Sequence, residues 1–131
     1  MSFTDEEIAY IRSQRLMRVA TVSDDGQPDV VPVGFELDGE QFYVGGYNPT
    51  NTRRARNVRA GNDRIAFVID DMVSTDPWTP RSLRVYGDAA LVERDGDEIL
   101  RITPRISWSM NLDGAWSAGS GAAPPPRRTV H

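Results

Sequence analysis

The 131-residue sequence contains no cysteine, no lysine and only one histidine, which is its last residue, His131. The absence of cysteine excludes disulfides, thiolate metal ligands and cysteine nucleophiles. A single histidine leaves almost no material for a Ser-His-Asp triad or a multi-histidine metal site. Asp70 and Asp71 are adjacent acidic residues, but a strand-end turn explains them better than a metal site. We therefore expect no metal site, and no side chain stands out as a catalytic residue.

Long apolar runs are also missing. No stretch approaches the roughly 20 apolar residues of a membrane-spanning helix, and the N-terminal sequence MSFTDEEIAYIR is acidic rather than signal-like. Hydrophobic residues make up 39% and charged residues 26%, which is typical of one packed domain. The net charge of −4 argues against general binding of nucleic acid. We expect a soluble, cytoplasmic protein that binds neither nucleic acid nor membrane.

The basic residues are all arginines, and they are distributed unevenly. Segment 48–62 holds four arginines and no acidic residue, whereas the rest of the chain has 11 arginines against 19 acidic residues. These four are Arg53, Arg54, Arg56 and Arg59. Planar guanidinium groups suit phosphate and carboxylate, so one dense cationic segment in an acidic chain suggests a local site for a small anion. A solvated arginine-rich surface, paired with acidic residues, is the alternative.

Cap and turn signals predict two helices and several short strands. Thr4 and Glu7 form a capping-box pattern at the start of a helix over 4–15, and a second helix is predicted over 51–61. Asp-Gly pairs separate short alternating apolar segments, which is typical of β-hairpins. Six strands are predicted, over residues 16–23, 28–37, 41–44, 64–69, 82–92 and 98–110.

Six short strands and two short helices predict a mainly β fold, a small antiparallel barrel, with a β-sandwich as the alternative. Gly87 and Pro104 indicate bulges or edge positions within two of the strands. Residues 70–80 are predicted to form a loop. The composition then changes to SAGSGAAPPP, which is typical of a flexible or polyproline segment. The chain therefore divides into a domain over 1–111 and a tail over 112–131.

The start of the 51–61 helix is the sharpest candidate site. Thr52, Arg53 and Arg54 lie in its first turn, where unpaired backbone N–H groups and the helix dipole already favour an anion. Cations at that end are unfavourable for the helix itself. Their clustering makes sense if an anion binds there.

Two further features suggest a flat ligand. Pro32 cannot donate to a sheet ladder and Gly34 leaves backbone exposed, so this strand can offer main-chain groups to a planar heterocycle. An ordinary edge strand is the alternative. The three tryptophans have core or interface packing as their usual role, and we assign a ligand-stacking role only to Trp108.

The order of these segments resembles a known family. ATVSDDGQPDVVPVGF (20–35), RRARNVRAGNDRIAFVIDD (53–71) and RVYGDAALVE (84–93) are together similar to the pyridoxamine 5'-phosphate oxidase-like split β-barrel superfamily. Within it the chain most resembles the small F420-dependent branch, and the ending RRTVH (127–131) is similar to one subfamily of that branch. The resemblance covers roughly residues 4–110. It implies a six-stranded antiparallel split β-barrel of the FMN-binding type.

The resemblance also implies a homodimer with two cofactor sites at the subunit interface. In such proteins the arginine segment holds the cofactor phosphate, the strand over 28–37 lines the ring through its backbone, and the strand of Trp108 approaches the partner's site. The residues assigned to the cofactor in this way are Val31, Pro32, Val33, Thr52, Arg53, Arg54, Asn57 and Trp108. The family often has lysine at the position of Arg54. The long C-terminal recognition region of true pyridoxamine phosphate oxidases is missing, which argues against pyridoxal phosphate chemistry.

The predicted function is that of an F420-dependent oxidoreductase. Reduced F420 would deliver a hydride from its C5 carbon to an electron-poor double bond, and the protein would position the reactants. Tyr47 and Tyr86 are candidate proton donors, and solvent is an equal alternative. An FMN-dependent enzyme would use the same residues. A non-catalytic cofactor-binding protein is a further alternative, and nucleic-acid binding is disfavoured by the net charge.

Overall fold

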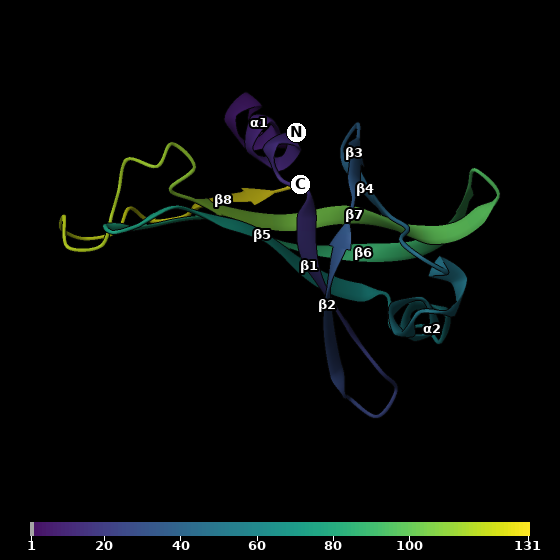
Figure 1. Ribbon diagram of the computed structural model, residues 1–131. Helices are drawn as coiled ribbons and strands as arrows, with labels where there is room; N and C mark the ends of the chain where they lie inside the picture. Colours follow the sequence, from purple (N-terminus) through teal and green to yellow (C-terminus); the bar gives the residue numbers. More distant parts are fainter. Residues whose placement is uncertain (1) are drawn as a thin grey trace.

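The computed structural model describes residues 2–131 as one antiparallel sheet with two helices packed beside it (Figure 1). The helices are α1 (Asp5–Ser13) and α2 (Arg53–Arg59), and a 3-10 turn, η1 (Pro49–Asn51), precedes α2. The strands are β1 (Leu16–Val22), β2 (Pro28–Gly34), β3 (Glu36–Asp38), β4 (Gln41–Val44), β5 (Arg64–Thr75), β6 (Trp78–Arg94), β7 (Asp97–Met110) and β8 (Arg127–Val130). Their order in the sheet is β2-β1-β5-β6-β7-β4-β3, and β8 pairs with β7.

The two ends of this strand order are neighbours in the chain. β2 ends at Gly34 and β3 begins at Glu36, so the sheet curls back on itself as in a barrel. The mainly β antiparallel fold predicted from the sequence is confirmed, with eight strands among residues 2–131 in place of six. The predicted strand over 28–37 is divided at Phe35 into β2 and β3, and residues near the C-terminus supply the eighth strand.

Alternating side chains of the strands form one hydrophobic core. On β1, Met17 and Val19 are buried, whereas Arg18 between them faces outward. Phe42 packs edge-on against Phe67, with their ring centroids 4.8 Å apart. Fully buried residues on the neighbouring strands are Ile69, Leu83, Val85, Leu100 and Ile102. Because the inward face holds the core, the outward face of the same strands is left for other contacts.

Helix α1 begins as its capping box predicts. The Thr4 hydroxyl accepts from the backbone N–H of Glu7 at 3.1 Å, and the Glu7 carboxylate accepts from the N–H of Thr4 at 2.9 Å. The helix ends at Ser13, two residues before the predicted end. Neither α1 nor α2 has the length and apolar character that crossing a bilayer requires.

The prediction of a loop over 70–80 is wrong. β5 and β6 continue through this segment as a long hairpin, which we call the arm (70–81). The prolines concealed the strands in the sequence. Pro80 fits within β6 because the pairing with β5 is irregular between Met72 and Ser74, where the ladder does not require its missing N–H.

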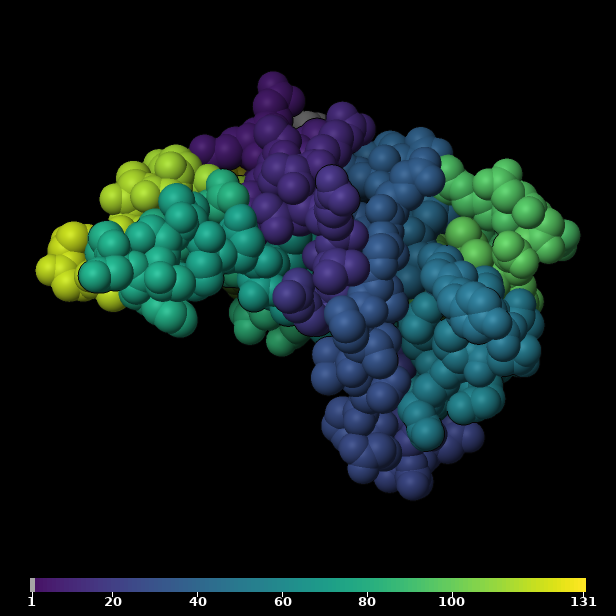
Figure 2. Space-filling model, in the orientation of Figure 1, coloured from purple at the N-terminus to yellow at the C-terminus, as the bar shows by residue number. Residues whose placement is uncertain are grey.

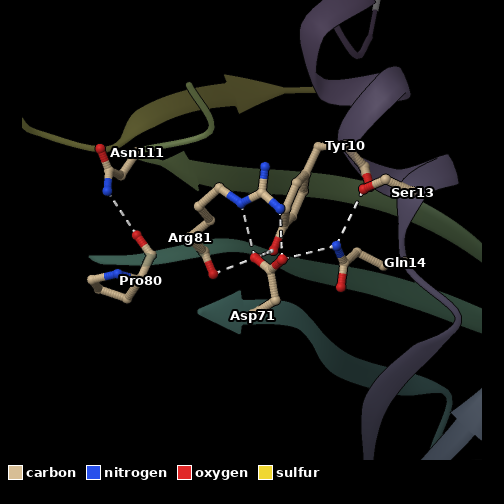
Figure 3. Close-up of polar contacts among 7 residues, drawn as sticks. All are labelled: Tyr10, Ser13, Gln14, Asp71, Pro80, Arg81 and Asn111. Carbon is tan, nitrogen blue, oxygen red and sulfur yellow. Dashed lines mark hydrogen bonds and ion pairs between the residues drawn. The ribbon is translucent and has the colours of Figure 1, made fainter. Parts of the chain in front are cut away.

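A polar cluster joins the base of the arm to α1 (Figure 3). The Asp71 carboxylate accepts from both Nε and Nη2 of Arg81, at 2.9 and 2.6 Å, and from the Tyr10 hydroxyl at 3.0 Å and the Gln14 amide at 3.1 Å. The hydrogen bond from Arg81 lowers the pKa of Asp71, while burial and then the charge of Asp71 raise the pKa of Tyr10. Asp71 is therefore a structural anchor between helix and sheet.

The C-terminal segment follows the arm before it returns to the sheet (Figure 1). The Asn111 side-chain amide donates to the Pro80 carbonyl at 2.8 Å, and the Ala118 N–H donates to the Trp78 carbonyl at the same distance. Residues 127–130, predicted to belong to a flexible tail, form β8. The division of the chain into a 1–111 domain and a 112–131 tail stays a prediction.

Candidate functional site

Strand β2 is an edge strand of the sheet. It pairs only with β1, so its other side has no strand partner among residues 2–131. Pro32 is exposed and Val31 is partly so, whereas the Val33 side chain points into the core. The structure therefore shows the edge strand that the sequence analysis gave as the alternative, and the edge position explains why Pro32 is tolerated. Binding of a planar ligand by this backbone stays a prediction.

Helix α2 is shorter than predicted. It spans seven residues rather than the segment 51–61, because Pro49–Asn51 forms the separate turn η1. The Thr52 hydroxyl caps it by accepting from the Ala55 N–H at 3.2 Å, and donates to the Pro49 carbonyl at 3.0 Å. With so short a helix, the positive potential of this segment comes mainly from its guanidinium groups.

Of the arginines in this segment, Arg54 is the one best positioned to bind an anion. Its Nη2 donates to the Gly45 carbonyl at 2.8 Å, and a Cβ on Gly46 would lie only 3.2 Å from the same nitrogen. Burial lowers the pKa of Arg54, and the charge of Asp29 raises it. Neither Arg54 nor the exposed Arg53 belongs to an ion pair among residues 2–131. A half-buried cation that belongs to no ion pair among these residues is suited to binding an anion.

Asn57 has a structural role. Its amide donates to the Thr21 hydroxyl at 2.9 Å, and both side chains are buried, so the contact fastens α2 to β1. The other arginines of the segment point elsewhere. Arg59 forms an ion pair with Glu98 at 2.6 Å, and Arg56 approaches only the Asn51 carbonyl, at 3.5 Å.

Trp108 lies on the outward face of β7, far from α2 along the sheet. Register partners connect it back to β2 in one row: Trp108, Arg84, Val68, Arg18 and Pro32. With strands about 4.8 Å apart, this row places Trp108 about 19 Å from Pro32 along the sheet. A single chain therefore does not bring together all the residues predicted to bind the cofactor.

The remaining aromatic candidates occupy different places. Tyr47 is almost fully exposed, whereas Tyr86 is 40% exposed and packs edge-on against Trp108 at 4.9 Å. Trp78 lies on the arm, and the Trp116 indole donates to the Gly121 carbonyl at 3.1 Å.

One cavity borders the segment that holds Arg54. It has a volume of about 370 Å³, and its walls include Gly45, Gly46, Phe35 and Tyr43. The Arg94 guanidinium lies 3.9 Å from the centre of the Tyr43 ring. No local motif in the sequence marks this wall, because its residues come from β2, β3, β4, β6, β7 and the segments between them.

This architecture is that of a split β-barrel. The edge strand β2 and the arginine-bearing helix α2 lie at one end of the sheet, and the outward face of the sheet is open. The chain belongs to the pyridoxamine 5'-phosphate oxidase family, whose sequence profile matches residues 3–130. It is 39% identical to the 5a,11a-dehydrotetracycline/5a,11a-dehydrooxytetracycline reductase of Streptomyces rimosus over 129 residues, which cover 91% of this chain and 90% of the reductase.

Solved structures share the fold at low sequence identity. The heme storage protein HutZ of Vibrio cholerae matches with a TM-score of 0.62 and 19% identity, over 80% of this chain and 92% of HutZ. A FAD-binding protein of Mesorhizobium loti matches with a TM-score of 0.62 and 18% identity, over 76% of this chain and 86% of that protein. These structures confirm the split-barrel fold, and the sequence profile and the reductase confirm the predicted family.

Proposed function

We propose that this protein is an oxidoreductase that uses reduced F420 to reduce an unsaturated small organic molecule. The observation that carries the proposal is the 39% identity, over nearly the whole chain, to a reductase of dehydrotetracyclines. When bound, reduced F420 would supply a hydride, which carries both electrons of the reduction, to the substrate double bond. The proton that completes the reduction would come from Tyr86 or from solvent. An unsaturated polycyclic compound of the dehydrotetracycline type is the first substrate to test.

The residues near α2 fit a phosphorylated cofactor. Within the part of the chain that the structure describes, the Arg54 side chain makes one hydrogen bond, to Gly45, which leaves most of its N–H donors for a phosphate. Arg53 adds a second cation from the solvent side. The free edge of β2 would orient the planar ring through the backbone of Val31 and Val33, while Thr52 and Asn57 hold the surrounding backbone in place.

We include a homodimer in this proposal. Parallel to the row that ends at Trp108 runs a second outward row: Val30, Ala20, Ala66, Tyr86, Ile106 and Val130. Val30 and Val130 are 63% and 62% exposed, an apolar face that a second copy would cover. Figure 2 shows the end of the β1–β2 hairpin projecting from the body, which leaves the surface concave between the hairpin and the arm.

A twofold arrangement would also complete the site. In an isologous interface each end of a surface row meets the opposite end of the same row on the other copy. With the axis near β5 and β6, β2 of one protomer would face β7 of its partner. The partner's Trp108 would then shield a ring held by Pro32 and its neighbours from water.

An FMN enzyme is the second candidate, supported by the structural likeness to a FAD-binding protein. FMN also has a phosphate and a planar ring, so the same residues would serve. Absorbance separates the two, because a bound oxidised flavin gives a yellow protein and a deazaflavin absorbs at shorter wavelength. A non-catalytic binder would take up cofactor without turnover.

The experiment is a pair of fluorescence titrations of the purified protein, one with F420 and one with FMN. Turnover of 5a,11a-dehydrotetracycline is then measured with the reduced form of whichever cofactor binds. We expect tight binding of F420, and substrate reduction that depends on it. Binding of FMN alone would transfer the proposal to a flavin enzyme, and cofactor binding without reduction of any unsaturated substrate would favour a binding protein.

A further inference from the structure

The outward face of β6, β7 and β8 carries a cluster of cations and aromatic rings. Arg84, Trp108 and Arg128 are register partners on three successive strands, so the indole lies between two arginines. Tyr86 is two residues from Arg84 on β6 and therefore on the same face. We call these four residues the aromatic platform. Arg84 and Arg128 are both exposed.

Cation–π contacts hold Arg84 in place. Its guanidinium carbon is 4.2 Å from the centre of the Trp108 ring and 5.6 Å from that of Tyr86. Neither Arg84 nor Arg128 forms an ion pair within the described chain, although the protein has more acidic than basic residues. The guanidinium of Arg84 is thus positioned by ring faces, which leaves its N–H groups without a carboxylate.

The two arginines of strand β8 lie on opposite faces of the sheet and have different partners. Arg127 pairs at 3.1 Å with Glu7, whose side chain is almost completely buried, and this contact ties β8 to α1. Arg128, the next residue, points to the other face, beside Trp108. His131 fastens the end of the strand, because its Nε2 lies 2.7 Å from the Ser107 hydroxyl. Arg128 is therefore presented by an anchored strand rather than by a loose tail.

We propose that the aromatic platform binds a planar conjugated anion, and that this anion is the substrate of the reaction proposed above. The inference rests on that proposed function. A conjugated ring system stacks on the layer formed by Arg84 and Trp108, and an ionised enol or carboxylate of the ligand accepts from the guanidinium groups. The two arginines are two strand spacings apart, about 10 Å, so a ligand of several fused rings reaches both.

The chemistry favours this occupant over a neutral one. The stacked Arg84 guanidinium and Trp108 indole offer a flat surface, and Arg128, the register partner of Trp108 on β8, adds a second positive charge that an anion would neutralise. The platform also lies at the opposite end of the outward row from β2. In the proposed dimer it would face the partner's cofactor edge, where a substrate must lie to receive a hydride.

Two matched probes test the platform on the full-length protein without any reductant. Anthraquinone-2-carboxylate is a planar anion, and anthraquinone-2-carboxamide is its neutral counterpart. We expect the protein to bind the carboxylate about tenfold more tightly than the carboxamide, the amount that one charge-assisted hydrogen bond provides. Quenching of tryptophan fluorescence gives both dissociation constants.

Three variants locate the binding. Arg84→Gln and Arg128→Gln should each weaken carboxylate binding about tenfold. Arg128→Gln should leave carboxamide binding unchanged, and Arg84→Gln should weaken it much less than carboxylate binding, because Arg84 also forms part of the stacking layer. Trp108→Leu should weaken both probes, because it removes the stacking surface. Arg12→Gln makes the same chemical change at an exposed arginine of α1 that forms no ion pair within residues 2–131, and it should alter neither probe. Equal affinity for the two probes, or equal effects of Arg12→Gln and Arg84→Gln, would overturn the proposal.

A titration of the same variants with F420 separates this inference from the proposed function. Unchanged F420 affinity in Arg84→Gln, together with weakened carboxylate binding, supports a substrate platform. If F420 affinity falls as much as carboxylate affinity, the platform belongs to the cofactor and the substrate assignment is wrong. If the wild type binds no F420 but still prefers the carboxylate through Arg84, the platform stands and the proposed deazaflavin function fails.

Discussion

Replacement of Arg54 by alanine is the sharpest test of the cofactor site. Among the described residues, 2–131, the Arg54 side chain makes one hydrogen bond, to the Gly45 carbonyl, so its loss should lower the free energy of unfolding by about 1 kcal/mol. A charge-assisted hydrogen bond to a phosphate contributes about 1.5–3 kcal/mol. At about 1.4 kcal/mol per factor of ten, Arg54→Ala should raise the dissociation constant of F420 roughly 10- to 150-fold.

Arg56→Ala is the matched control for this prediction. Arg56 lies on the same helix and is exposed, and the one hydrogen bond of its side chain to the described part of the chain is to the Asn51 carbonyl, at 3.5 Å. We expect its removal to change cofactor affinity much less than Arg54→Ala does. Fluorescence titration gives the dissociation constants, and urea unfolding followed by circular dichroism gives the stabilities. Wild-type affinity in a folded Arg54→Ala protein would refute the phosphate assignment.

Three predictions concern stability. Asp71→Asn should cost about 1–3 kcal/mol at pH 7, because two hydrogen bonds from Arg81 lose their charged acceptor. The pKa of Asp71 is lowered in the folded protein, so this difference should be complete above pH 5 and disappear as the pH falls through the folded-state pKa; a pH-independent difference would contradict the ion pair. Gly87→Ala should cost about 1–3 kcal/mol in urea unfolding, because its Cβ would lie 2.8 Å from a backbone carbonyl oxygen, whereas Gly34→Ala, with no atom closer than 3.9 Å, should be nearly neutral. Burial lowers the pKa of His131, so the wild type should lose stability as the pH falls below about 6.5, where the unfolded chain takes up the proton first. His131→Gln should remove that part of the pH dependence, and an unchanged pH profile would show that another group causes it.

The features that were predicted correctly from the sequence depend on residues close to one another along the chain. The capping box of α1 and the Asp-Gly turns depend on residues within about four positions of each other. The bulge predicted near Gly87 and Pro104 is confirmed, because the register between β6 and β7 shifts at Tyr86 and Gly87. The split-barrel fold was also predictable, because the motifs by which the chain resembles its family are short segments that follow one another along the sequence.

The errors have a different origin. The prolines of segment 70–80 indicate a loop when only neighbours in sequence are considered, but Asp71 and Arg81 pair across the hairpin and extend both strands. The shortening of α2 follows from the turn at Pro49, which takes Asn51 out of the helix. Strand β8 depends on partners on β7 that lie about 20 residues earlier in the chain, so the composition around it gave no signal.

The amino-acid sequence by itself determined the class of fold, the position of the arginine-rich segment and the absence of thiol chemistry, because composition and local hydrogen bonding suffice for these. Only the tertiary structure decided that Arg54 is half-buried beside Gly45, that Arg127 reaches Glu7 across 120 residues, and that Arg128 lies beside Trp108. These contacts join segments far apart in the chain. Their partners are selected by the closing of the whole sheet around one core, which no local pattern of residues encodes.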